Sequence, residues 1–312
     1  MVARISPARR RPRLTGRLLA VITALVLGSA VLTACAATSR PSAAGAQDAP
    51  AAAANATPPV GVVVTDDVPY AATASPRQTL DVCAPNPNGT VHPAVVLVHG
   101  GGWMKGDKST VASECEWLAQ AGFVTFNVDY RLAPAARFPT QPDDVAAAVR
   151  FIREPATVAR YEIDPSRVGI FGGSAGANLA TLVALDHDNH LDALVELSGP
   201  MDLTGRVSPR QNPALTVDET SYLGCRTLAR CPQARSASPL SHVTAAAPPT
   251  FIGQAAVDFV PRQQGDALAA ALKRVGVPVT VEQNPGAHHS FAVMTPTMKT
   301  DIIAFLHAHL GT

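Results

Sequence analysis

Five residues near the middle of the chain, Gly172-Gly173-Ser174-Ala175-Gly176, form the pattern with the clearest chemical meaning. The apolar run 168–171 precedes them and a helical pattern follows from Ala175. A serine at such a strand-to-helix turn is a candidate nucleophile, since its hydroxyl is exposed close to the free N–H groups of the helix start. A phosphate-binding turn is the alternative, although the sequence lacks the Gly-Lys-Ser/Thr ending of a P-loop and the dinucleotide fingerprint.

A serine hydroxyl is a weak nucleophile until a base accepts its proton, so a histidine and an orienting carboxylate are expected downstream. Asp258 follows the apolar run 249–252, and His289 follows the run 277–281. The chain order serine, aspartate, histidine is the order in which one class of serine hydrolases carries its catalytic residues. We therefore predict that Ser174, Asp258 and His289 form a catalytic triad.

Other residues compete for both supporting roles. His288 adjoins His289, which we favour as the base because it lies two residues before an aromatic residue. Asp266 and Asp202 are the alternatives to Asp258 as the carboxylate, and Asp266 is expected on a solvated helix face.

A second glycine-rich segment, His99-Gly100-Gly101-Gly102-Trp103, directly follows the apolar run 94–98. Glycines let backbone N–H groups approach a substrate oxygen closely, and two such donors are the core of an oxyanion hole. A plain turn after a strand is the alternative interpretation.

The elements that must position these residues alternate along the chain. We expect buried strands at residues 94–98, 123–128, 168–171, 193–197, 249–252 and 277–281. We expect helices at residues 109–121, 143–153, 175–185, 262–275 and 297–309. Mostly apolar strands separated by helices predict a mainly parallel sheet with helices on both faces, here in one catalytic domain over residues 60–312.

Taken together, these segments resemble the α/β-hydrolase-fold carboxylesterases of the hormone-sensitive-lipase type and related bacterial acyl esterases. The resemblance runs from about residue 79 to the C-terminus. The matching segments are 99–108 (HGGGWMKGDK), 129–134 (DYRLAP), 138–144, 164–178 (DPSRVGIFGGSAGAN), 198–200, 258–261 and 286–291.

The resemblance implies a serine carboxylesterase that cleaves a small or medium ester, small-molecule or lipid, through an acyl-enzyme and without a cofactor. It also implies that the N–H groups of Gly101, Gly102 and Ala175 form the oxyanion hole. The preference for esters over amides rests on likeness alone, because the same triad serves other chemistry. An acyltransferase or peptidase acting on cell-envelope material remains open, as does a catalytically silent binding lipoprotein.

The sequence departs from these families at two positions near the nucleophile. Gly173 stands where they often carry Asp or His, and Ala177 stands where a glycine is common. Neither change removes a catalytic atom. The segment before the first glycine-rich strand provides only two short strands, so a helical cap over the site is expected to be reduced or absent.

Composition fits one globular domain behind an export leader. The chain has 312 residues, of which 47% are hydrophobic and 16% charged, enough for one large core. The first 34 residues hold six arginines and no acidic residue. From residue 35 onward 19 basic residues face 24 acidic ones, so the mature part has no reason to bind nucleic acid.

Residues 1–34 have the layout of a signal peptide, with a basic start and an apolar stretch at 18–32 that is too short to remain as a membrane span. The stretch ends in Leu-Thr-Ala-Cys, which resembles a lipobox, so Cys35 is expected to carry lipid; ordinary cleavage nearby, with secretion, is the alternative. Residues 35–59 are poor in large apolar residues and are expected to form a flexible tether. The protein is therefore expected on the outer face of the cell membrane or in a periplasm-like space, after export by either the general or the twin-arginine route.

Four cysteines remain if Cys35 is lipidated, and an even number in an exported chain favours disulfides. Of three possible connectivities we favour Cys225 with Cys231, which closes a short local loop, and therefore Cys83 with Cys115. A zinc site is the alternative, but the usual ligand spacing is missing and we expect no metal.

Overall fold

A computed structural model describes residues 61–72, 75–209 and 212–311, all within the structural unit 55–312. The expected signal peptide, the tether and Cys35 lie outside the described residues. No helix in the described part of the chain has the length and apolar character needed to cross a membrane.

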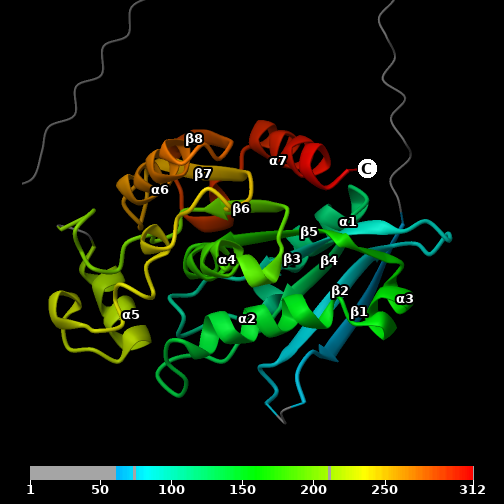
Figure 1. The fold of residues 1–312 in the computed structure, drawn as a ribbon, viewed down its shortest axis with the longest axis horizontal. Helices are drawn as coiled ribbons and strands as arrows, with labels where there is room; N and C mark the ends of the chain where they lie inside the picture. The colour runs from blue at the N-terminus through cyan, green and yellow to red at the C-terminus, as the bar shows by residue number, and fades with distance from the viewer. Residues whose placement is uncertain (1–60, 73–74, 210–211, 312) are drawn as a thin grey trace, which may run out of the picture. The chain divides into compact units, whose positions relative to one another are not determined.

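An eight-stranded sheet forms the centre of the described unit, in the order β1-β2-β4-β3-β5-β6-β7-β8 (Figure 1). The strands are β1 (Val62–Pro69), β2 (Thr79–Pro85), β3 (His92–Val98), β4 (Val124–Val128), β5 (Ile163–Gly173), β6 (Ala193–Leu197), β7 (Thr250–Val257) and β8 (Val279–Ala287). The pairs from β4 to β8 are parallel, and only β1 with β2 and β2 with β4 run antiparallel. The α/β-hydrolase fold predicted from the sequence, with its mostly parallel sheet, is therefore confirmed.

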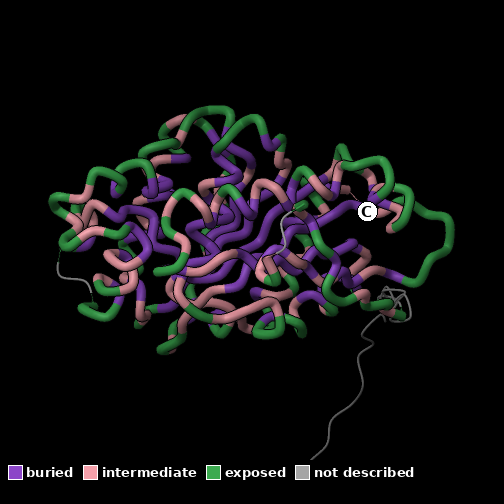
Figure 2. The backbone as a smooth tube through the Cα atoms, turned by 90° about the horizontal axis from the view of Figure 1, so that it is seen from below, coloured by how far each residue is buried: buried purple, intermediate pink, exposed green. Residues whose placement is uncertain are grey.

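Helices cover both faces of this sheet (Figure 1). They are α1 (Ala112–Gln120), α2 (Thr140–Phe151), α3 (Pro155–Tyr161), α4 (Ala175–Leu185), α5 (Pro213–Leu223), α6 (Gln263–Arg274) and α7 (Pro296–Leu310). In β3, Val95 and Leu97 pack with α1 and α7, whereas Val96 and Val98 pack with α2 and α4. Both faces of the strand are therefore covered, which explains its continuous apolar run and the buried strands in Figure 2.

Two helices, α3 and α5, were not predicted from the sequence. The α5 helix lies in the β6–β7 connection, which we define as residues 198–249. Its start and stop signals are present: the Asn212 side chain accepts a hydrogen bond from the Ala214 N–H, Pro213 is the first helical residue, and Gly224 ends the helix at a φ of 69°. In the described residues before β3 there is no helix, as expected for a reduced cap.

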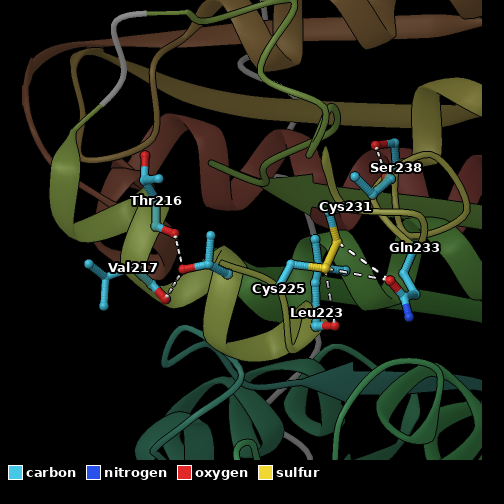
Figure 3. Close-up of a disulfide and its surroundings, with 9 residues drawn as sticks. Thr216, Val217, Leu223, Cys225, Cys231, Gln233 and Ser238 are labelled. Carbon is cyan, nitrogen blue, oxygen red and sulfur yellow. Dashed lines mark hydrogen bonds between the residues drawn. A yellow bond between two sulfur atoms is a disulfide. The ribbon is translucent and has the colours of Figure 1, made fainter. Parts of the chain in front are cut away.

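Both favoured disulfides are present in the structure. Cys83 of β2 is joined to Cys115 of α1, with the Cα atoms 5.8 Å apart. Cys225 is joined to Cys231 just after α5, next to Leu223 at the end of that helix, with the Cα atoms 5.6 Å apart (Figure 3). The first bridge ties a sheet strand to a covering helix, and the second closes a small loop within the β6–β7 connection.

Candidate active site

Ser174 lies at the sharp turn where β5 ends and α4 begins. Its φ of 54° and ψ of −123° are strained for a residue with a side chain, and its N–H donates to Leu197 O at 2.8 Å. A Cβ at Gly172 would overlap the Gly176 carbonyl, and one at Gly176 would overlap the Val98 carbonyl. The two outer glycines are therefore required by backbone contacts, as the sequence pattern indicated.

The three residues predicted to form the triad come together at the strand tips. His289 Nε2 lies 2.7 Å from Ser174 Oγ, and His289 Nδ1 lies 2.6 Å from Asp258 Oδ1. Asp258 directly follows β7, and His289 comes two residues after the end of β8. Because a carboxylate oxygen can only accept, Nδ1 carries the proton and leaves Nε2 free to accept one from the serine.

The competing residues lie elsewhere. His288 is exposed, with its ring beside Gly286, and in the described structure it makes no hydrogen bond with Ser174. The Asp266 carboxylate accepts a hydrogen bond from the Gln254 side chain. The Asp202 carboxylate accepts from three backbone N–H groups of its own loop. None of the three alternatives reaches the serine.

Asp258 is held from two further sides. Its side chain is 1% exposed, Ser198 Oγ donates to Asp258 Oδ2 at 2.6 Å, and the Val260 N–H donates to Oδ1 at 3.0 Å. Ser198 adopts a φ of 56°, so the backbone just after β6 is strained where it presents this hydroxyl. The sequence analysis included residues 198–200 among the matching segments but gave Ser198 no role.

Glu196 is a second buried carboxyl near the triad. Burial raises the pKa of Glu196 to about 8; a hydrogen bond from the Gly199 N–H opposes this rise, and the nearby Asp258 adds to it. At neutral pH this carboxyl is therefore mainly protonated, and Asp258 has no second negative charge beside it.

The cavity beside Ser174 is also lined by Gly101, Gly102 and Ala175. The backbone N–H groups of these three residues donate to no other residue in the described part of the chain. Gly101 and Gly102 adopt φ angles of 117° and 61°, which glycine tolerates without strain. This arrangement is compatible with an oxyanion hole, to which the dipole of α4 would add positive potential.

His99 packs against the glycine loop and is fully buried. Its Nδ1–H donates to the Gly100 carbonyl at 2.7 Å, and its ring stacks on Tyr130 with centroids 4.4 Å apart. Burial lowers the pKa of His99 to about 4, so the ring is neutral at physiological pH. It therefore shapes the loop and cannot act as an acid or base near pH 7.

Two cavities meet at the triad. The nucleophile cavity has a volume of about 280 Å³, and the outer cavity beside it about 440 Å³. The nucleophile cavity is lined by Gly100, Gly101, Gly102, Trp103, Lys105, Ser174, Ala175, Pro200, Leu215, Asp218, Phe259, His289 and Ser290. The outer cavity is lined by Gly100, Gly101, Lys105, Gly106, Thr110, Val111 and residues 289–292. A larger cavity, about 470 Å³ between α2 and α4, is lined by none of the three predicted triad residues, so the nucleophile cavity is the candidate substrate site.

The departure at Gly173 has a packing explanation. A Cβ at this position would overlap Ser290 Oγ and would lie 2.5 Å from the Phe291 ring. The segment that follows His289 therefore leaves no space for a larger side chain at position 173 unless Ser290 and Phe291 move.

Among the described residues, no group of three or more His, Cys, Asp or Glu side chains is arranged to hold a metal ion.

Comparison with known proteins gives the same family as the motifs. The family model BD-FAE matches residues 80–272, more than half of the chain. Esterase LipQ of Mycobacterium tuberculosis is 28% identical over 260 residues, 77% of this chain and 60% of that protein. Ethyl acetate hydrolase of Pseudomonas putida is 32% identical over 219 residues, 64% of this chain and 66% of that protein.

Solved structures give the same fold. A truncated form of carbohydrate esterase from gut microbiota superposes with a TM-score of 0.71 at 23% identity, covering 82% of this chain and 99% of that one.

The chain spans only 50% to 60% of the length of the first three curated relatives, all mycobacterial. The resemblance to hormone-sensitive-lipase-type carboxylesterases is thus confirmed, and the chain belongs to the BD-FAE family.

Proposed function

We propose that the chain is a serine carboxylesterase that hydrolyses a small or medium carboxylic ester through an acyl-enzyme. The observation that carries the proposal is the continuous hydrogen-bonded series from Asp258 through His289 to Ser174, facing three free backbone N–H groups. The relatives support ester chemistry, and ethyl acetate hydrolase takes its name from a small ester.

In the first half-reaction, Ser174 Oγ attacks the ester carbonyl carbon while His289 Nε2 accepts its proton. Asp258 keeps the histidine ring in the required tautomer and stabilises its positive charge. The carbonyl oxygen becomes an oxyanion that accepts hydrogen bonds from the free N–H groups, where each donor contributes about 3 kcal/mol. The bond to the alcohol oxygen then breaks, and that oxygen takes the proton from Nε2.

In the second half-reaction a water molecule replaces the alcohol. His289 Nε2 accepts a proton from the water as its oxygen attacks the acyl carbon, and the same N–H groups stabilise the second oxyanion. The bond to Ser174 Oγ breaks, the serine regains its proton, and the carboxylic acid leaves. Each step uses groups of this chain and water alone.

A panel of p-nitrophenyl esters of increasing acyl length tests the proposal directly. The full-length chain should hydrolyse the short esters, Ser174→Ala should lose this activity, and Ser113→Ala, at an exposed serine of α1, should keep it. A fluorophosphonate probe should label the wild-type chain at Ser174. A chain that is neither labelled nor active on any ester would instead be a silent binding protein.

The same assay separates hydrolysis from related chemistry. Peptide amides, and ester reactions supplied with a second alcohol or an amine as acceptor, are run beside the ester panel. Faster release from amides would identify a peptidase, and transfer that exceeds hydrolysis would identify an acyltransferase. Either result would overturn the esterase proposal.

We further propose that residues 1–34 are removed on export and that Cys35 is lipidated, anchoring the domain to the outer membrane face through the tether 35–59. The support is the basic and apolar layout of the leader and the Leu-Thr-Ala-Cys sequence. Two disulfides in the domain fit an oxidising compartment. Mass spectrometry of the mature N-terminal peptide tests this: a diacylglyceryl group is expected at Cys35, and an unmodified or uncleaved N-terminus would contradict it.

A further inference from the structure

Asp218 places a carboxylate in the nucleophile cavity, directly against the oxyanion loop. A Cβ at Gly102 would lie 2.5 Å from Asp218 Oδ2 and 2.7 Å from its Cγ, so this side chain packs on the backbone of an oxyanion residue. Leu215, one turn earlier on α5, lines the same cavity. The helix therefore presents one apolar and one charged side chain to the bound substrate.

The Asp218 carboxylate makes no hydrogen bond or ion pair with any described residue. Burial raises the pKa of Asp218, and the positive charge of Lys105 opposes that rise. Apart from His289, these two residues supply the only titratable side chains among the described residues that line the nucleophile cavity. A negative charge without a partner among the described residues also disfavours the oxyanion that must form close by, unless the substrate itself provides a hydrogen-bond donor.

The position of Asp218 is fixed by the packing of α5. Tyr222, one turn further along the helix, is fully buried and stacks on Trp103 with ring centroids 4.4 Å apart and an interplanar angle of 3°. The Tyr222 carbonyl accepts a hydrogen bond from the Phe138 N–H at 3.1 Å. The disulfide between Cys225 and Cys231 then closes the loop that follows (Figure 3). The carboxylate is thus carried by a helix anchored beside the oxyanion loop.

The acyl part of the substrate must occupy this cavity. The acyl group remains bonded to Ser174 after the alcohol leaves, and Ser174 lines the nucleophile cavity but not the outer cavity. The alcohol oxygen must reach His289, which lines both cavities, so the outer cavity suits the leaving alcohol. With the acyl group assigned to this cavity, Asp218 is one of the residues that line the space for the first carbons of the acyl chain.

We propose that Asp218 is a specificity-determining residue that selects esters of short hydroxy acids, with the hydroxyl on the second or third carbon of the acyl chain. This inference rests on the proposed esterase function. A hydroxyl donates to the carboxylate and can accept from the Lys105 ammonium, whereas a charged amino group can pair with the carboxylate but is repelled by that lysine. A plain acyl chain leaves the carboxylate without a partner.

The test compares kcat/KM for ethyl 3-hydroxybutyrate and ethyl butyrate, measured by acid release, in the wild type, Asp218→Asn and Asp218→Leu. The ratio of kcat/KM for the hydroxy ester to kcat/KM for ethyl butyrate should be about tenfold or more higher in the wild type than in Asp218→Leu. The reason is that the variant loses a hydrogen bond to a charged group. Asp218→Asn keeps an acceptor oxygen and should fall between the two. Asp218→Leu should also hydrolyse ethyl butyrate a few-fold faster than the wild type, since the charge beside the oxyanion is gone.

Val217→Ala is the matched control, because Val217 lies on the same helix and is 59% exposed. It should keep the wild-type preference, and melting curves of all variants should show that they are folded. An unchanged preference in Asp218→Leu would overturn the inference while ester hydrolysis stands, and faster turnover of ethyl 3-aminobutyrate than of the hydroxy ester would also overturn it. No hydrolysis of any ester by the wild type would overturn the esterase function and this inference with it.

Discussion

The strand tips and the β6–β7 connection both form the nucleophile cavity, but they are held in place by different means. At the strand tips Ser174, Asp258 and His289 follow the ends of β5, β7 and β8, so hydrogen bonding between parallel strands fixes their spacing. The connection contributes Leu215 and Asp218 from α5, which no strand pairing holds. The α5 helix is held by packing of its buried side chains, including a ring stack with Trp103, and by one backbone hydrogen bond to Phe138, and a disulfide closes the loop that follows it.

This difference predicts that the strand tips carry out the reaction and that the α5 helix determines which ester is preferred. Moving a strand tip by one residue would turn its side chains to the other face of the sheet and abolish the triad. The α5 helix can change its side chains, or shift slightly, without disturbing the three reacting groups. We therefore expect substitutions at the strand tips to change kcat, and substitutions in α5 to change which ester is preferred.

The largest effect is expected when the predicted base at the strand tips is removed. His289→Ala should lower kcat/KM for every ester by about 10⁴-fold or more, because the serine loses its base. His288→Ala should change it less than about twofold, because His288 is exposed and does not reach Ser174. Steady-state assays with one short p-nitrophenyl ester check both variants, and equal losses in the two would contradict the assignment of the base.

The two disulfides sharpen the comparison, because one joins the central sheet to α1 and the other lies in the β6–β7 connection. They span 32 and 6 residues, so replacing Cys83 and Cys115 by serine should cost about 4 kcal/mol of unfolding free energy and replacing Cys225 and Cys231 about 2 kcal/mol. Urea unfolding measures both values. The second pair should also weaken the preference for hydroxy esters while turnover of ethyl butyrate stays within about twofold. A general loss of turnover would show that α5 is needed for the reaction itself.

The smallest effect concerns Glu196, the buried carboxyl at the strand tips. Its pKa is about 8 in the folded chain against an ordinary value of 4.5, so the native state keeps a proton that the unfolded chain releases. Stability from this group is complete below pH 4.5 and is lost as the pH rises toward 8. When the pH rises from 5 to 7, the unfolding free energy of the wild type should therefore fall by roughly 2 kcal/mol more than that of Glu196→Gln.

Urea unfolding of the wild type and Glu196→Gln at several pH values measures this difference. The half-buried Asp218 provides the contrast, because Asp218→Asn should change the pH dependence of stability much less. Parallel pH dependences for the wild type and Glu196→Gln would show that Glu196 is already ionised in the folded chain.

The strand tips could be predicted from the sequence because each catalytic residue directly follows an apolar run. The helix expected at residues 175–185 coincides with α4, and the expected strands all appear, although several extend further than predicted. The need for glycine at positions 172 and 176 could also be predicted, because the atoms that a side chain would meet there belong to the neighbouring backbone and not to side chains from elsewhere.

The β6–β7 connection was less predictable. Its start signal at Asn212 and Pro213 and its stop at Gly224 are visible in the sequence, but the low contrast between the helix faces gives no strong periodic pattern between them. The contact of Asp218 with Gly102 joins residues more than 100 positions apart and depends on the path of the whole connection. The contact of Ser198 with Asp258 likewise needs the pairing of β6 with β7, which spacing alone does not reveal.

The packing of Ser290 and Phe291 on Gly173 couples the nucleophile turn to the loop that carries the base. Any engineering that introduces the larger residue found in related families at position 173 would push that loop aside and draw His289 away from Ser174. Such a change would need compensating changes at both positions 290 and 291. Position 173 should therefore be changed together with positions 290 and 291 when this scaffold is redesigned.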